Sequence, residues 1–558
     1  MKKLLWISDF VGSGYAMASN TILNELLKSN KYDIYILPIN TMMDKKFLID
    51  KIKSNLQIQE KKILYELTAS PDIAKTNNPL SSKYYYENII GLFNIDRFVE
   101  KVRPDIIFSI NDNGILSNHI NTLNFNYRKW NGKMYGYLAI DCTNFRKDFF
   151  KCLNNYDKII AMTEFGKNEL IKSEFKRPLS VLNHPINNNF QVLDKNKCRN
   201  ELFGNILNNK FVILNTNIAC KRKRHDITLK AFAEFCKDKD DVVLIFKCAY
   251  KNKNKLDVNS HFDMEKMTNR FVRDKNKVLF LEQHLDLDKL CKLFNCPDVG
   301  INTTSGEGWG LTPCEMALCG VPQIIPNNTS YPEIFGKNYD YIKTEEQSHS
   351  AGRNNISDDG VLYKNDTINP NSIVSFLVSY PTFVEDNSSH EFVEKLEIQK
   401  DCYNILLSEF GSNDLQNLNK SNVSLNDLDI HLNLNNISLV EELYNTQKDL
   451  FKNKPIQIII QLGKDGSFLI KNALGNKRIF ESKNRTTYQL DSELLYGTYD
   501  QNGIKVHIPT IEDTVRILNK YYYNRDLLKK DGKKCRKEIL SKFSPEKICN
   551  QLINILEN

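Results

Sequence analysis

The sequence predicts an α/β protein made of two successive Rossmann-like domains. A chain of 558 residues is too long for one compact core, so it is expected to form two or three domains. Short apolar runs alternate with helix-type stretches, and this order is typical of a parallel sheet covered by helices on both faces. The alternation begins again after a linker around 183–190, which indicates a second unit of the same kind.

The first domain is expected over residues 1–190. Its apolar run Leu4–Ser8 is followed by a loop that holds Gly12 and Gly14, and then by a helical pattern that reaches Leu27. This order predicts a strand, a glycine loop and a helix, although a glycine pair also serves any tight turn. Further strands are predicted at 32–37, 105–110, 134–140 and 158–162, the last followed by a threonine-capped helix in TEFGKNEL.

The second domain is expected over residues 191–343, where the same alternation returns. Helical patterns cover 226–236, 286–294 and 312–319, and they lie between apolar runs of strand type. Strands are predicted at 211–214, 242–246, 278–281, 299–302 and 323–326.

The amino-acid composition and the hydrophobic pattern of the chain change at about residue 344. Asn, Ser, Asp and Leu dominate residues 344–495 without a clean period, and we interpret this segment as an insertion of unknown role. Within it, PIQIIIQL and GSFLIKN are predicted strands joined around 464–466. Ordinary α/β patterning returns near Gly503, so residues 496–558 are expected to complete the C-terminal domain and to end in closing helices.

Charge and cysteine content exclude several classes of protein. Lysine and arginine number 76 against 68 acidic residues, and the resulting net charge of +8 is mild for this length. Such an excess suits phosphate-bearing substrates or an anionic membrane surface, although most surface charges only solvate the exterior. The 13 cysteines are scattered without matched Cys-x-x-Cys pairs. Neither a zinc site nor a secreted disulfide scaffold is therefore expected, and a reduced, cytoplasmic compartment fits better.

The N-terminus MKKLLWISDF begins like a signal peptide. Asp9 ends its apolar run early, however, so the segment is better interpreted as a first buried strand. No stretch approaches the roughly 18 apolar residues that a membrane span requires. A soluble protein, or at most a peripheral one, is expected.

The most informative segment is SGEGWGLTPCEMALCGVP, residues 305–322. It holds two glutamates, Glu307 and Glu315, with Gly308 and Gly310 between them and a helix opening near Thr312. Glycines let a backbone approach a ligand closely, and a helix N-terminus directs free N–H groups and a positive dipole at an anion such as a diphosphate. Glu315, one turn into the helix, is placed to accept hydrogen bonds from two neighbouring hydroxyls such as those of ribose.

A structural alternative exists for the same residues. Thr312 and Glu315 also fit a capping box, with Pro313 at the first helical position, and in that case Glu315 only satisfies the backbone. The doubled glycines and the second glutamate favour a ligand site.

This segment resembles the signature of glycosyltransferase family 4, in the GT-B superfamily. The two glutamates in EGWGLTPCEMALCGVP have the spacing of that signature. The resemblance extends to VLFLEQHLDLDKLCKLFNCPDVGINTTSGEGWGL, to KRKRHDITLKAFAEF and to YDKIIAMTEFGKNEL, and it leaves residues 344–495 outside.

The resemblance implies a GT-B fold, in which two Rossmann-like domains face a cleft, with an insertion in the C-terminal domain. The N-terminal domain would hold the acceptor, and the C-terminal domain would hold the nucleotide sugar. It implies a retaining, metal-independent glycosyltransferase that moves a sugar from a nucleotide-diphosphate-sugar donor to a hydroxyl acceptor without a cofactor. Two Asp-x-Asp strings, at 286–288 and 427–429, could suggest a metal site. Neither follows a strand with a glycine loop nearby, and the first begins a helix, where acidic residues favour the dipole.

The resemblance also implies roles for single residues. Glu315 would bind the donor ribose, Glu307 the donor sugar, and Lys223 the diphosphate. The arginine that usually accompanies this lysine is absent, because the preceding strand leads into 215–217, and Arg222 is the candidate replacement. The backbone at the glutamate segment would hold sugar and phosphate groups at Gly308, Trp309, Gly310, Leu311 and Thr312.

In the first domain, Gly12 and Gly14 match the family's glycine loop facing the cleft. The family often carries a histidine after the strand that corresponds to YGYLAI, whereas this chain has Asp141, which is the candidate for contact with the transferred sugar. Glu333 matches a cleft-lining loop of the family, although an acidic residue in such a loop is more often simply exposed to solvent.

Other functions remain open at this stage. A non-catalytic sugar-nucleotide-binding protein of the same fold is the main alternative, and a phosphorylase- or epimerase-type enzyme is another. The basic runs KRKRH and KNKNK could instead mark a nucleic-acid patch. We expect a nucleotide-sugar donor and a hydroxyl acceptor of unknown class (glycan, lipid or protein) as partners, with possible peripheral membrane association and no nucleic acid.

Overall fold

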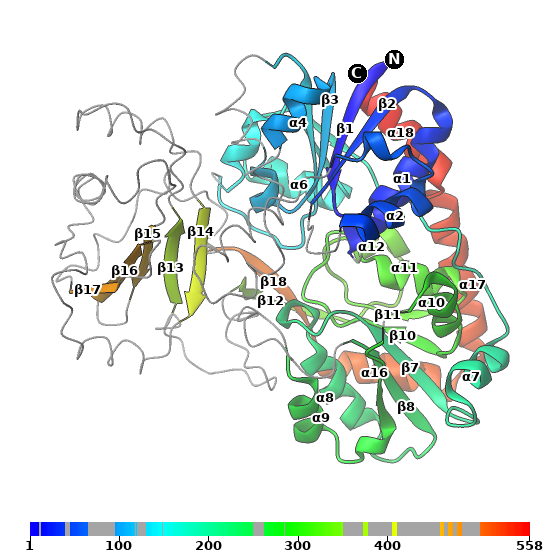
Figure 1. The fold of residues 1–558 in the computed structure, drawn as a ribbon. Helices are drawn as coiled ribbons and strands as arrows, with labels where there is room; N and C mark the ends of the chain where they lie inside the picture. The colour runs from blue at the N-terminus through cyan, green and yellow to red at the C-terminus, as the bar shows by residue number, and fades with distance from the viewer. Residues whose placement is uncertain are drawn as a thin grey trace.

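The computed structural model describes most of the two predicted domains. The described residues are 1–10, 13–39, 45–64, 95–117, 119, 130–147, 149–248, 262–283, 285–349 and 503–558, together with the backbone of five strands between 372 and 481. In these parts, helices enclose two groups of strands, one above the other in Figure 1.

The N-terminal domain contains a six-stranded parallel sheet in the order β2-β1-β3-β4-β5-β6. Successive residues of its central strand face opposite sides, so Leu4 and Trp6 join one core cluster while Leu5 and Ile7 join the other. All four side chains are fully buried because helices cover both faces. The strands are β1 (Lys2–Ser8), β2 (Tyr32–Pro38), β3 (Ile106–Asn111), β4 (Lys133–Leu138), β5 (Lys158–Ala161) and β6 (Leu179–Val181).

The helices of this domain begin where the sequence supplies caps. Ser13 caps α1, and its Oγ accepts a hydrogen bond from the Ala16 N–H at 3.1 Å. Thr163 caps α6 in the same way through the Gly166 N–H at 3.0 Å, as predicted. The helices are α1 (Gly14–Ser29), α2 (Lys45–Leu56), α4 (Ile95–Val102) and α6 (Glu164–Lys172), with the short 3-10 helices η1 (Glu60–Lys62) and η3 (Lys151–Asn155).

The C-terminal domain contains a five-stranded parallel sheet in the order β11-β10-β7-β8-β9. Its first strand in the chain, β7, lies at the centre with two strands on either side, which is the order of a Rossmann half. The predicted fold class, two successive Rossmann-like α/β units, is confirmed. The strands are β7 (Phe211–Thr216), β8 (Val242–Lys247), β9 (Val278–Phe280), β10 (Val299–Ile301) and β11 (Gln323–Ile324).

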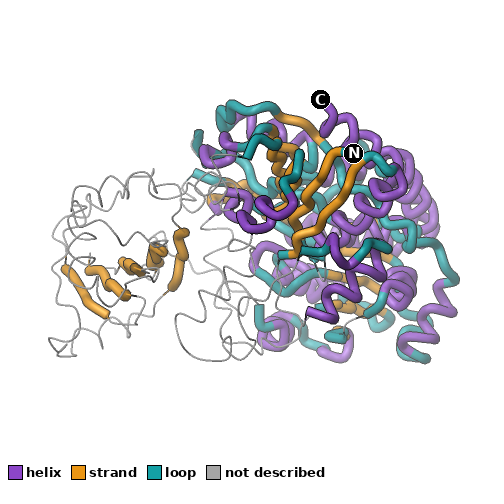
Figure 2. The backbone as a smooth tube through the Cα atoms, turned by 45° about the horizontal axis from the view of Figure 1, so that its top comes forward, coloured by secondary structure: helices purple, strands orange, loops and turns teal. Residues whose placement is uncertain are grey.

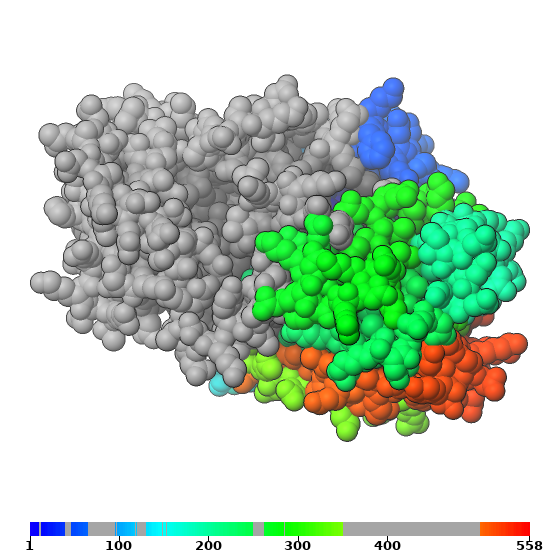
Figure 3. All heavy atoms as spheres, turned by 90° about the horizontal axis from the view of Figure 1, so that it is seen from below, coloured from blue at the N-terminus to red at the C-terminus, as the bar shows by residue number. Residues whose placement is uncertain are grey.

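Helices surround this second sheet as well, as Figure 2 shows. Asp286 caps one of them, α10, by accepting a hydrogen bond from the Lys289 N–H at 2.8 Å. The helices that precede residue 344 in this domain are α7 (Lys195–Phe203), α8 (His225–Phe235), α9 (Met264–Phe271), α10 (Leu287–Asn295), α11 (Leu311–Leu318) and α12 (Tyr331–Phe335), with the short 3-10 helices η4 (Lys221–Lys223) and η5 (Lys275–Lys277). After residue 503 the chain adds α16 (Ile511–Tyr523) and α17 (Arg525–Lys542), which lie along this domain in orange in Figure 3.

The last helix, α18 (Pro545–Glu557), returns to the N-terminal domain. It packs against α1, and both chain termini lie close together in Figure 1. Its buried Ile548 and Leu552 belong to the same core cluster as Leu4 and Trp6. The chain therefore crosses between the domains twice.

The start of the predicted insertion pairs with a strand that follows the insertion in the chain. β12 (Thr344–Ser348) pairs antiparallel with β18 (Lys505–Pro509), and Lys505 forms two backbone hydrogen bonds with Thr143 of the N-terminal domain, at 2.9 and 3.0 Å. Most of 344–495 lies outside the described residues. Five strands within it form two antiparallel sheets, β13 (Ser372–Leu377) with β14 (Asn404–Glu409), and β15 (Ile458–Leu462) with β16 (Ser467–Asn472) and β17 (Lys477–Glu481). The predicted strands PIQIIIQL and GSFLIKN are confirmed as β15 and β16, while their turn at 464–466 is outside the description.

Candidate functional site

The two domains meet at the carboxyl ends of their strands, which is where ligands bind in open α/β sheets. A Cβ atom added to Gly308 would lie 2.7 Å from the Cβ of Ala139, and one added to Gly14 would lie 3.2 Å from Cδ1 of Leu311. Real side chains do not tolerate the first distance. These glycines therefore allow the domains to touch, and Gly12, the other predicted loop glycine, is outside the described residues.

Glu307 is held by two cations of its own domain. Its carboxylate accepts a hydrogen bond from Arg222 Nη1 at 2.8 Å and another from Lys223 Nζ, and its backbone N–H donates to Thr329 Oγ1 at 2.9 Å. Burial alone would raise the pKa of Glu307, but the two adjacent positive charges outweigh it and lower the pKa to about 2. Glu307 is therefore ionised across the physiological range.

Arg222 connects this cluster to the N-terminal domain. Its Nη1 also donates to the carbonyl oxygen of Gly306 at 2.8 Å, while its Nε lies 3.4 Å from Asp141 Oδ2. The sequence-predicted residues Arg222, Lys223, Glu307 and Asp141 are thus brought together at the domain interface.

Two residues of the basic run KRKRH are not on the surface. Arg224 is 2% exposed and forms a buried ion pair with Asp226 at 2.8 Å, and His225 is fully buried. A nucleic-acid patch needs exposed cations, so Arg224 and His225 do not contribute to one. The run KNKNK lies outside the described residues.

Two further polar residues line the same side of the interface, and the sequence interpretation missed both. Tyr15 Oη donates a hydrogen bond to Asp112 Oδ1 at 2.5 Å. Asp112 directly follows β3 and Asp141 follows β4, so both acids stand beyond the carboxyl ends of neighbouring strands. The position of Asp112 after the run DIIFSIN was the available signal.

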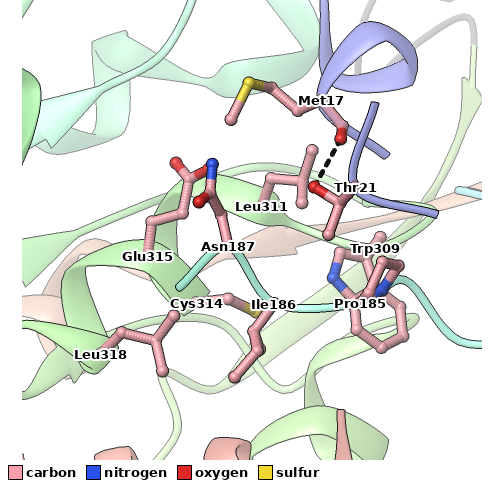
Figure 4. A pocket seen from close by; sticks show the side chains of 10 residues that line it. All are labelled: Met17, Thr21, Pro185, Ile186, Asn187, Trp309, Leu311, Cys314, Glu315 and Leu318. Atoms are coloured by element: carbon pink, nitrogen blue, oxygen red, sulfur yellow. Dashed lines mark hydrogen bonds between the residues drawn. The ribbon is translucent and has the colours of Figure 1, made fainter. Parts of the chain in front are cut away.

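Glu315 lies apart from the charged cluster, in a largely apolar pocket between the domains (Figure 4). Its carboxylate points toward the side chain of Asn187 in that view. Burial raises the pKa of Glu315 to about 8, so the carboxyl is largely protonated at neutral pH. The pocket is lined by Met17, Thr21, Pro185, Ile186, Asn187, Trp309, Leu311, Cys314, Glu315 and Leu318.

The capping-box alternative for Glu315 is wrong. Helix α11 begins at Leu311, directly after Gly310, whose φ of 93° lies in the left-handed region, and no side chain caps it. Thr312 is already inside the helix, so it does not occupy the capping position. The glycine sets the start of the helix here, since a Cβ at Gly310 would also lie 2.5 Å from the ring of Tyr331.

The side chains of Trp309 and Glu333 both make contacts within the protein. The Trp309 side chain is mostly buried, with its ring centroid 4.8 Å from that of Phe543, and it also lines the pocket of Glu315. Glu333 is not a solvated loop acid, because it accepts hydrogen bonds from the Phe165 N–H and from Asn183 Nδ2, both at 3.2 Å. These contacts tie α12 to the N-terminal domain.

Neither Asp-x-Asp string is seen to form a metal site. Asp286 is committed to capping α10, while Asp427 and Asp429 lie outside the described residues. In the described parts of the chain, no three His, Cys, Asp or Glu side chains are grouped so that they could hold a metal ion. Independence from metals stays a prediction.

Solved structures that are similar to this chain include proteins described as glycosyltransferases. One from Rickettsia africae is 15% identical, with a TM-score of 0.44, over 62% of this chain and 84% of that chain. Anabaena HepE in complex with UDP-glucose is 15% identical, with a TM-score of 0.45, over 62% of this chain and 85% of that one. Sucrose-phosphate synthase from Thermosynechococcus elongatus is 11% identical, with a TM-score of 0.45, over 62% and 86%. No protein-family profile and no curated protein sequence matches the chain.

The fold and the site thus define a two-domain α/β protein with a charged cluster and an apolar pocket between its domains. None of its described helices is both long enough and apolar enough to cross a bilayer.

Proposed function

We propose that the protein is a retaining, metal-independent glycosyltransferase that moves a sugar from a nucleotide-diphosphate-sugar donor to a hydroxyl acceptor. The bond between the anomeric carbon and the diphosphate breaks, and the diphosphate leaves with the electron pair. The acceptor oxygen forms the new bond, and its proton goes to an oxygen of the departing diphosphate.

Each candidate residue has a part in this reaction. Arg222, Lys223 and the N-terminus of α11 stabilise the charge that develops on the departing diphosphate, in the place where other enzymes use a metal. Glu315 binds the ribose hydroxyls in the apolar pocket, Glu307 contacts the donor sugar, and Asp141 faces the transferred sugar from the N-terminal domain. Contact between the domains excludes water from the reacting atoms.

The observation that carries the proposal is the meeting of Arg222, Lys223, Glu307 and Asp141 at one point between the domains. Two adjacent cations can hold an anionic leaving group, and the carboxylates beside them can contact its sugar. The ribose of the donor is placed at the separate pocket of Glu315, which lies beside the same helix α11.

A non-catalytic sugar-nucleotide-binding protein is the second candidate. It is favoured by the pairing of Glu307 with Arg222 and Lys223, because in this arrangement the carboxylate is not free to act on a sugar. Turnover distinguishes the two candidates, since both require donor binding.

A thermal-shift screen against UDP-, GDP-, ADP- and CMP-sugars tests donor binding, because a ligand that binds only the folded state raises its stability by mass action. The donor that stabilises the protein is then incubated with it, and release of the nucleoside diphosphate is followed with and without a panel of glycan, lipid and small-molecule acceptors. Stabilisation by a sugar nucleotide followed by acceptor-dependent release is the expected result. Binding without release across the panel favours the second candidate, and no binding of any sugar nucleotide removes both.

A further inference from the structure

One carboxylate forms ion pairs with two cations at the domain interface. Glu307 receives hydrogen bonds from both Arg222 and Lys223, and its side chain is 7% exposed while that of Lys223 is 14% exposed. A buried charge without a partner is costly, so this pairing keeps the cations in place when no ligand is bound.

The two cations differ in their other contacts. Within the described chain Lys223 forms an ion pair only with Glu307, whereas Arg222 also pairs with Asp141 of the opposite domain at 3.4 Å. Arg222 therefore shares its charge between a carboxylate of each domain.

A diphosphate competes for the same donors. It carries more negative charge than a carboxylate and offers more acceptor oxygens, so it makes stronger charge-assisted hydrogen bonds with an arginine and a lysine. It cannot share the two cations with an ionised Glu307 at close range, because the like charges repel each other.

We propose that Glu307 acts as a built-in occupant of the anion site, and that an entering diphosphate displaces its carboxylate from Arg222 and Lys223. The displaced carboxylate becomes available to the donor sugar. Because Arg222 turns to the diphosphate, Asp141 is released from its salt bridge in the same step. This inference rests on the proposed function, since it assumes that the cation pair receives the donor's diphosphate.

Inorganic pyrophosphate is the probe that isolates this step, because it lacks both sugar and nucleoside. Its dissociation constant is measured by isothermal titration calorimetry for the wild type and for Glu307→Gln, Asp141→Asn and Lys223→Met. Removing the competing carboxylate is expected to tighten pyrophosphate binding about tenfold or more in Glu307→Gln. Asp141→Asn is expected to tighten it less, since only Arg222 is released, and Lys223→Met is expected to weaken it.

Asp340→Asn is the matched control. Asp340 also pairs with one arginine and one lysine, Arg516 and Lys520, both at 2.8 Å, but it lies away from the interface cluster. This variant changes the net charge as Glu307→Gln does and removes one ion pair from an arginine and one from a lysine. Arg516 keeps its ion pair with Asp513, as Arg222 keeps its ion pair with Asp141 in Glu307→Gln. Its affinity for pyrophosphate is expected to equal that of the wild type.

The outcomes separate the inference from the function on which it rests. Equal or weaker pyrophosphate binding by Glu307→Gln, relative to the wild type, overturns the inference alone. The same holds if Asp340→Asn tightens binding as much as Glu307→Gln does. Absence of pyrophosphate binding in every protein removes the anion site and with it the proposed function. If Glu307→Gln does not fold, the Asp141→Asn variant tests the inference in its place. Asp141 is partly exposed, and its replacement leaves the buried ion pair between Glu307 and Lys223 intact. An unchanged affinity for pyrophosphate in Asp141→Asn overturns the inference.

Discussion

Arg222 Nε lies 3.4 Å from Asp141 Oδ2, so a salt bridge joins the loop before α8 in the C-terminal domain to the end of β4 in the N-terminal domain. Both partners are about one-third exposed, and such a pair contributes little to stability by itself. This salt bridge matters because it positions a side chain. Asp141 holds the Arg222 guanidinium beside Glu307, and Asp141 belongs to the domain that is expected to hold the acceptor.

Replacement of Glu307 by Gln is expected to reduce the rate of sugar transfer by about 100-fold or more, because a charged group beside the reacting atoms is lost. The measurement is the initial rate of nucleoside diphosphate release with the donor found by thermal shift. Asp340→Asn, which carries the same change of charge, should keep the wild-type rate. Wild-type turnover in Glu307→Gln would refute the assignment of Glu307.

Glu315→Gln is expected to weaken binding of the donor's nucleoside diphosphate while leaving the affinity for pyrophosphate unchanged. The carboxyl of Glu315 lies in the apolar pocket and not among the cations, so only a ligand with a ribose is predicted to reach it. Calorimetric titration of one variant with both ligands provides the comparison. Equal losses for both ligands would show that Glu315 acts on the phosphate site instead.

The pH dependence of folding stability should carry opposite contributions from the two glutamates. Glu307 has a folded-state pKa of about 2, below its ordinary value of 4.5, so its contribution is present above pH 4.5 and is lost as the pH falls toward 2. Glu315 has a folded-state pKa of about 8, above 4.5, so its contribution is present below pH 4.5 and is lost as the pH rises through 8.

The contribution of Glu315 can be measured separately. Urea unfolding at pH 5 and at pH 8.5 should show that the wild type loses more stability over this interval than Glu315→Gln does, by up to a few kcal/mol. The amide has no proton to lose, which makes it the matched variant. Equal losses in the two proteins would mean that Glu315 is already ionised in the folded state at pH 5.

Gly308→Ala is expected to destabilise the protein by about 1–3 kcal/mol through overpacking and to impair domain contact. The added Cβ would lie 2.7 Å from Ala139 Cβ and 3.2 Å from Ala139 Cα, and a backbone atom cannot move aside alone. Gly14→Ala is the milder counterpart, because its Cβ would meet only the end of the Leu311 side chain, at 3.2 Å. Thermal unfolding of both variants, with small-angle scattering to detect separation of the domains, should rank Gly308→Ala as the more damaging. Equal behaviour would contradict the close contact at Gly308.

Much of the fold could be predicted because strand and helix patterns are local. The apolar runs at Leu4–Ser8 and Phe211–Leu214 became the central strands β1 and β7, since strands buried on both faces require continuous apolar side chains. The threonine cap of α6 was predictable for the same reason, as a cap depends on residues three positions apart.

Long-range relationships could not be predicted in this way. The helical pattern of α18 shows an apolar face but does not say that α1 will cover it. The start of α11 depends on the left-handed φ of Gly310, whereas the sequence offered Thr312 as an equally good start. The pairing of Glu307 with Arg222 was likewise missed, because the resemblance assigned them to different parts of one ligand.

The return of α18 to the first domain makes that domain discontinuous in sequence. During synthesis Leu4, Trp6 and Ile22 leave the ribosome long before Ile548 and Leu552, which belong to the same core. This core therefore cannot be completed until α18 has been translated, and α18 follows the whole of the second domain in the chain.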